Sequence, residues 1–176
     1  MNKISFSIAL ILLVCCPIVF AQNERVDKYV WEKQNDGNYG CKYDGDGGHI
    51  DLFEKGKIIQ ILDGNTIIFK GEKGQKRKVK LIAVDSDANE KKAKTFLEES
   101  ALNKDAELTY SSSQSNSKNV NGIIEINGKD INRLMLELGL VKYKDSKVYQ
   151  ISYFNDCVYF RTEDKARSGK LGIWAK

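Results

Sequence analysis

Apolar and polar residues along segment 57–88 form three short β-branched runs, and turn residues separate them. The first break is Asp63-Gly64-Asn65, and the second is the polar segment 71–76. Glycine and asparagine tolerate positive φ, so such breaks are typical of tight turns between antiparallel strands. The pattern therefore predicts a three-stranded meander, with strands at 57–62, 67–70 and 77–84.

Beyond the meander, helical and strand patterns alternate. Apolar residues recur every three or four positions at 90–103 and 130–138, which predicts two helices, and a third helix is expected at roughly 152–168. The second helix would end at Gly139 and bury four apolar residues, Ile131, Leu134, Met135 and Leu138. Strands are predicted at 106–110 and 121–126, joined by a mobile, serine-rich loop at 111–119. This mixture of strands and helices places the chain in the α+β class.

The N-terminus has the features of a signal peptide. Lys3 precedes an apolar run at 4–20, and a small-residue cleavage site ends at Ala21. The run is short for a membrane span, so no span is expected after cleavage. Lipidation at Cys15 or Cys16 is disfavoured because the residue before Cys15 is not small. A secreted or periplasmic protein is predicted.

Two cysteines, Cys41 and Cys157, remain after that cleavage. An even pair in an exported chain predicts one disulfide, and two buried free thiols are the alternative. The bridge would join an N-terminal extension, residues 22–56, to the last helix. A closed loop of this length contributes about 3–5 kcal/mol in the chain-entropy description.

The extension also contains an acidic, glycine-rich loop at 43–49. Counted from Asp44, the twelfth position is Lys55, where a calcium-binding EF-hand requires a carboxylate. The spacing therefore favours a turn over a calcium loop. His49 is the only histidine, and no nucleophile motif accompanies it.

The meander resembles the paired motifs of the staphylococcal nuclease family, Asp-Gly-Asp-Thr and Arg-Leu-x-Gly-Ile-Asp-x-Pro-Glu. They stand here as Asp63-Gly64-Asn65-Thr66 and as Lys80-Leu81-Ile82-Ala83-Val84-Asp85-Ser86-Asp87-Ala88. Further landmarks follow in the family's order at 127–132, 138–140, 163–167 and 171–174. The resemblance implies a five-stranded OB-type β-barrel with three helices over residues 57–176.

Members of that family hydrolyse phosphodiester bonds of DNA or RNA with calcium. The resemblance therefore implies calcium as a cofactor, with metal ligands at Asn65 and Asp85 and a phosphate-binding residue at Lys80. Asparagine brings no negative charge, and lysine lacks the planar fork with which arginine binds phosphate. Of these positions, only Asp85 retains the family residue.

The position of the family's glutamate base is Ala88, which carries no carboxylate. The nearest replacements in the chain are Asp87 and Glu90. Loss of a positioned base typically lowers a rate by about 10²- to 10⁴-fold. The family's second phosphate-binding arginine has no counterpart at 117–120, where Lys118 is the nearest cation. These substitutions predict weak or absent catalysis.

Three hypotheses follow for a chain expected to be a monomer. It is a calcium-dependent nuclease with a reworked site at Lys80, Asp85 and Asp87, a non-catalytic module that binds nucleic acid or another polyanion, or a domain that binds a protein partner. The candidate nucleic-acid contacts are Lys78, Lys80, Lys118, Tyr110 and Tyr143. The net charge of +4, lowered by one when the segment with Lys3 is removed, slightly favours the protein partner over the polyanion.

Overall fold

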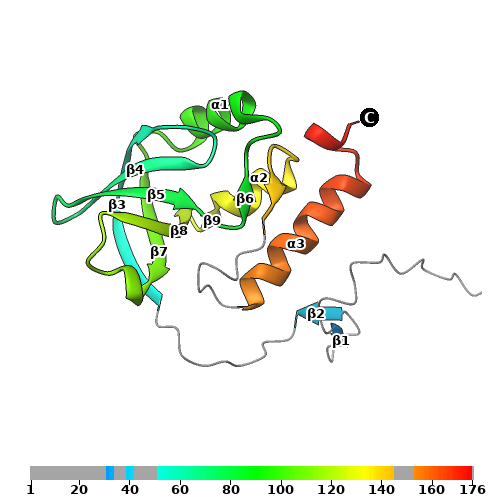
Figure 1. The fold of residues 1–176 in the computed structure, drawn as a ribbon, viewed down its shortest axis with the longest axis horizontal. Coiled ribbons are helices and arrows are strands. Elements are labelled where there is room, and N and C mark those ends of the chain that lie inside the picture. The colour runs from blue at the N-terminus through cyan, green and yellow to red at the C-terminus, as the bar shows by residue number, and fades with distance from the viewer. Residues whose placement is uncertain (1–30, 34–38, 42–50, 145–152, 176) are drawn as a thin grey trace, which may run out of the picture.

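A closed barrel of five strands forms the centre of the structure, a computed structural model that describes residues 31–33, 39–41, 51–144 and 153–175. Its strands are β3 (Asp51–Ile61), β4 (Thr66–Gly71), β5 (Lys76–Leu81), β7 (Asp105–Ser111) and β8 (Asn119–Ile126). They neighbour one another in the order β5-β4-β3-β7-β8, and a parallel pairing of β8 with β5 closes the ring (Figure 1). The predicted signal peptide, the loop at 43–49 and His49 lie outside the described residues.

Three helices and several short elements surround the barrel. The helices are α1 (Glu90–Ser100), α2 (Ile131–Glu137) and α3 (Tyr153–Ser168), and the 3-10 turns are η2 (Ser112–Gln114) and η4 (Gly172–Trp174). The short strands are β1 (Trp31–Lys33), β2 (Tyr39–Cys41), β6 (Val84–Asp85), β9 (Lys129–Asp130) and β10 (Lys142–Tyr143). Helix α1 covers one end of the barrel, and α2 and α3 pack together on the side of β6 and β10 (Figure 1). The predicted α+β class, with a five-stranded barrel and three helices, is confirmed.

The first barrel strand is longer than its sequence pattern predicts. It begins at Asp51, six positions before the expected start, because residues 51–57 pair with β7. The strand then passes from β7 to β4 at Gly56, where a Cβ atom would lie 2.2 Å from the Lys70 carbonyl oxygen. Residues 51–56 include several charged residues and form no apolar run. This part of the strand can therefore be recognised only from its pairing with β7.

The third strand ends earlier than predicted. It stops at Leu81, and a turn at Ile82 and Ala83 follows, with Ala83 at φ +60°. The chain then forms β6, which pairs with β10 rather than with the barrel. The expected continuous strand to residue 84 is therefore wrong. The turn moves Asp85 out of line with β5.

Two other predicted segments differ in detail. Helix α1 stops at Ser100, since Asn103 adopts φ +60° and its N–H donates to the Ile58 carbonyl. The loop expected to be mobile at 111–119 contains η2 and several hydrogen bonds to the barrel. Polar composition did not predict this order because the partners lie on distant strands.

Helix α2 buries a different face at its end than predicted. Leu136 is fully buried, whereas Leu138, expected in the core, is 43% exposed. Leu138 is already the C-cap, and Gly139 follows at φ +64°, so the helical spacing no longer applies there. The confirmed part of the face, Ile131 and Met135, packs on the barrel core.

A half-buried carboxylate fixes the start of the same helix. Asp130 is the N-cap of α2, and its Oδ1 accepts a hydrogen bond from the Arg133 N–H over 2.9 Å. Its Oδ2 accepts a 2.5 Å hydrogen bond from the buried Tyr159 hydroxyl on α3. Burial raises the pKa of Asp130 above its usual value, although both hydrogen bonds act in the opposite direction.

This raised pKa predicts how stability changes with pH. The folded state holds the Asp130 proton more tightly than the unfolded state. The free energy of unfolding should therefore fall as pH rises from the usual carboxyl pKa through the raised one. Asp130→Asn keeps a side chain that can cap the helix, and it should remove the contribution of Asp130 to the pH dependence of the free energy of unfolding. Urea unfolding between about pH 3.5 and 7 measures it. Asp105→Asn, at a side chain 89% exposed, is the control, and an equal slope in all three proteins would contradict the prediction.

Candidate nucleic-acid interface

The two motifs that resemble the nuclease site come together at one edge of the barrel. Asn65 lies in the turn between β3 and β4, and its Nδ2 donates to the Val84 carbonyl oxygen over 3.4 Å. The backbone carbonyl oxygen of Asn65 accepts a hydrogen bond from the Leu81 N–H over 2.8 Å. These bonds bring Asn65 beside the ribbon that carries Asp85. The close approach of these two strand ends follows from the barrel's curvature.

The side-chain oxygens at this edge already have protein partners. Asn65 Oδ1 accepts from the Thr66 hydroxyl over 3.1 Å, and Asp85 Oδ1 accepts from the Asp87 N–H over 3.0 Å. Asp85 Oδ2 lies 3.9 Å from the Lys144 ammonium nitrogen. Calcium prefers six to eight oxygen ligands, several of them charged. One carboxylate beside an ammonium group does not fit that ion.

The position of a general base is equally poor. Ala88 and Asp87 are exposed in the turn before α1, and Glu90 is exposed in the first turn of that helix. Within the ranges that the structure describes, no group of three or more histidine, cysteine, aspartate or glutamate side chains could hold a metal ion. We therefore derive no metal-dependent step from these residues.

A row of lysines leaves this edge and follows the outside of the barrel. In β5, Lys76, Lys78 and Lys80 are exposed, whereas Val79 and Leu81 between and after them are buried. This is the alternation expected of a strand with one face in the core. The sequence of β5 therefore places three ammonium groups on one outer face.

Neighbouring strands extend the row. Lys70 on β4 lies opposite Lys76, and Lys118 precedes β8 and accepts a backbone hydrogen bond from the Lys78 N–H over 2.8 Å. Both added lysines are exposed. We call the set Lys70, Lys76, Lys78, Lys80 and Lys118 the lysine surface.

The five ammonium groups of the lysine surface form no ion pair among the described residues. Lys70, at one end of the row, also lines a pocket with Glu72, Glu107 and Glu125. Alternate residues of a strand lie roughly 6.7 Å apart, so the charges on β5 repeat regularly. A regular cationic row that faces solvent can bind a flexible polyanion along its length.

The model of the staphylococcal nuclease homologue family matches residues 72–176. The chain belongs to the staphylococcal nuclease family. A search of the curated proteins found no match. Members of this family bind nucleic acids, so its chemistry agrees with a cationic face. In the described part of this family member, no helix is both long and apolar enough to cross a membrane.

Two predicted aromatic contacts do not lie on the lysine surface of this nuclease-family barrel. Tyr110 is 6% exposed, and its hydroxyl donates to Glu54 Oε2 inside the barrel end over 3.3 Å. Burial raises the pKa of Tyr110. Tyr143 is half-buried and meets the ring of Phe160 edge-on at 5.7 Å. The prediction that Tyr110 stacks on a ligand is wrong, because inward alternation on β7 places its ring in the core.

The three predicted lysines do come together, and the structure adds residues that the sequence analysis missed. Lys70 and Lys76 join Lys78, Lys80 and Lys118 through the β4–β5 hairpin. Asn121 lies beside Lys80 in the parallel pairing of β8 with β5. The alternating lysines of 76–80 were a visible signal for Lys76. The parallel pairing that places Asn121 there was not visible locally.

Proposed function

We propose that this staphylococcal nuclease domain binds single-stranded nucleic acid along the lysine surface and does not cleave it. The observation that carries the proposal is the row of five exposed lysines, which have no ion-pair partner within the described part of the chain. OB barrels bind single strands on an outer face, and lysines neutralise the phosphates. Among the described residues, none of the five lysines contacts an aromatic ring, so the binding would follow the backbone and show little sequence preference.

The residues at the family site support the proposed loss of cleavage. Asp85 is paired with Lys144, and the side-chain oxygen of Asn65 accepts a hydrogen bond from the Thr66 hydroxyl. Ala88 stands at the position of the family's base. Binding would then require no calcium. The competing function, a calcium-dependent nuclease with a base near Asp87 and Glu90, is the alternative that the same samples can test.

Export and a disulfide are part of the same proposal. The N-terminal segment that ends at Ala21 supports secretion or a periplasmic location. Cys157 is buried in α3 and disulfide-bonded, and β2, which ends at Cys41, contacts that helix. A bond between Cys41 and Cys157 would fasten the extension to the domain.

Salt dependence is the first measurement for this proposal. Residues 22–176 should bind a fluorescent single-stranded oligonucleotide, measured by anisotropy, with an affinity that falls steeply with salt. If four or five phosphates are contacted, the slope of log affinity against log salt should be about −3. Chelator should leave both the affinity and the slope unchanged.

The same protein should leave plasmid and single-stranded DNA intact in calcium. Asp85→Ala runs beside it as the matched variant and should bind as the parent does. Calcium-dependent cutting that disappears in Asp85→Ala would establish the nuclease instead. A slope near zero would refute binding through the lysine surface.

A further inference from the structure

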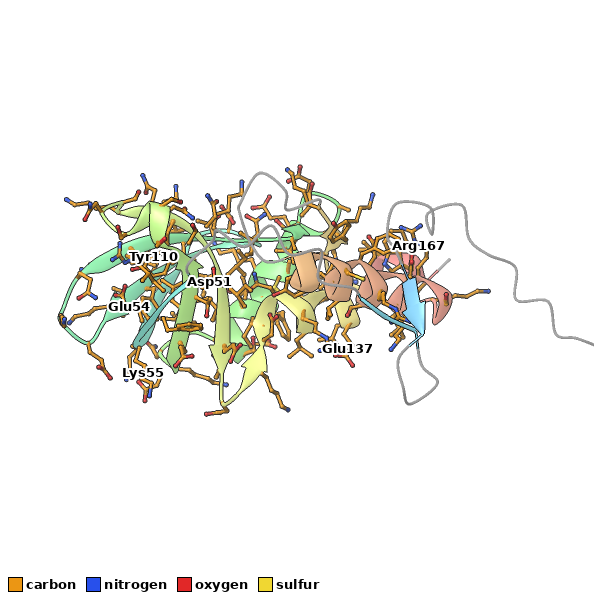
Figure 2. The ribbon with its side chains drawn as sticks, turned by 90° about the horizontal axis from the view of Figure 1, so that it is seen from below. Asp51, Glu54, Lys55, Tyr110, Glu137 and Arg167 are labelled. Carbon is orange, nitrogen blue, oxygen red and sulfur yellow. The ribbon has the colours of Figure 1, made fainter. Side chains whose placement is uncertain are left out.

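Arg77 is the one basic residue of β5 that does not face outward with the lysines. The alternation of the strand directs it into one end of the barrel, where its side chain is 14% exposed. Its Nε donates to Glu54 Oε2 over 2.8 Å, and its guanidinium lies 4.9 Å from the centre of the Tyr110 ring. Glu54 and Tyr110 lie on the paired strands β3 and β7 at this end of the barrel (Figure 2).

The remaining donors of Arg77 reach the segment that leads to Lys118. Nη1 donates to the Ser117 carbonyl oxygen over 2.5 Å, and Nη2 donates to that of Ser115 over 3.3 Å. A planar guanidinium can bind two carbonyls and a carboxylate at once, which a lysine cannot do in this geometry. Arg77 therefore joins three strands to one loop.

The loop is held by hydrogen bonds rather than by apolar contacts, and one of them runs from the Lys78 N–H to the Lys118 carbonyl oxygen. Residues 112–118 contain serine, glutamine, asparagine and lysine but no apolar side chain. Burial of apolar surface, the main force that orders a chain, is therefore unavailable to it. Gln114 ties one side of the loop to Asn121 on β8 over 2.8 Å. Arg77 provides the side-chain ties on the side of β5.

We propose that Arg77 is a positioning residue for nucleic-acid binding, an inference that rests on the proposed function. It holds 115–117 against the barrel so that Lys118 stays beside Lys78 on the lysine surface. An ammonium group held in place loses less conformational entropy on binding than one on a loose loop. Arg77 would act without touching the ligand, through the position of Lys118.

The test is a double-mutant cycle between Arg77 and Lys118. Arg77→Lys keeps the positive charge and removes the planar guanidinium group. It should make the salt slope shallower by about 0.7, the contribution of one phosphate contact on a single strand. Lys118→Ala should have the same effect. The double variant should match either single variant, because both remove the same contact. Additive effects, or an unchanged slope in Arg77→Lys, would overturn the proposal.

Hydrogen exchange supplies a readout that does not depend on binding. Amides of 112–118 should exchange faster in Arg77→Lys, while those of β4 should not change. Should Arg77→Lys fail to fold, Glu54→Gln loosens the same guanidinium and should make the slope shallower by the same amount. If the parent protein binds no oligonucleotide, the proposed function fails, and unchanged exchange at 112–118 would separately refute the positioning role.

Discussion

Asn132→Ala should lower the free energy of unfolding by about 4 kcal/mol, because it removes three buried hydrogen bonds to backbone groups. Asn132 lies in α2 and is 0% exposed. Its Nδ2 donates to the carbonyl oxygens of Ile82 and Gly122 over 3.0 and 3.1 Å, and its Oδ1 accepts from the Ile124 N–H over 3.3 Å. Urea unfolding followed by circular dichroism measures the loss.

Two variants make this test specific. Asn132→Asp keeps the shape and the acceptor but removes both donors, so most of the loss should remain. Asn116→Ala changes the same residue type at an exposed loop position and should stay within about 0.5 kcal/mol of the parent. A loss below about 1 kcal/mol in Asn132→Ala would mean that water or other protein groups replace its hydrogen bonds, and the role assigned to this asparagine would be wrong.

The position of Asn132 also explains why its role could not be derived from local pattern. Residues 127–132 contain a turn and a helix start that the sequence predicts correctly. Asn127 and Gly128 adopt positive φ, and Asp130 caps α2. A polar residue in the first turn of a helix is ordinary, so nothing marks Asn132 as buried. Its partners on the turn after β5 and on β8 become neighbours only when the barrel closes.

In the candidate site too, local pattern predicted some residues and missed others. The lysines of β5 could be predicted because alternation within one strand places them on one face. Lys70 requires the hairpin register, and the burial of Tyr110 requires the inward face of β7. Short-range patterns thus predicted the strands and most of the cations. They failed where a residue's surroundings come from distant segments.

Net charge is a weak guide to a polyanion partner for a related reason. A chain of +4 gives only weak support to a polyanion partner. Association depends on local density of charge, and the fold collects five lysines on β4, β5 and the start of β8. Glu107 on β7 and Glu125 on β8 lie opposite each other and line a pocket with Lys70, so carboxylates approach the row at its Lys70 end. The local density of lysines on β5 therefore matters more for binding than the near balance of the whole chain.

Reversal of three charges on the lysine surface should have the largest effect on binding. The variant Lys76→Glu, Lys78→Glu and Lys80→Glu removes three phosphate contacts. Each contact contributes about 0.7 to the salt slope, so the slope should become shallower by about 2. Extrapolated from 1 M to 0.1 M salt, this corresponds to a roughly 100-fold loss of affinity, before the added repulsion is counted. Anisotropy titrations at several salt concentrations measure both quantities.

A matched triple variant separates the local effect from that of net charge. Lys104→Glu, Lys129→Glu and Lys165→Glu change the net charge equally, at exposed positions away from β4 and β5. This control should alter the slope by much less than one contact, because charges beyond a Debye length of about 10 Å are largely screened at 0.1 M salt. Equal losses in the two triple variants would show that binding follows total charge, and the lysine surface would then have no special role.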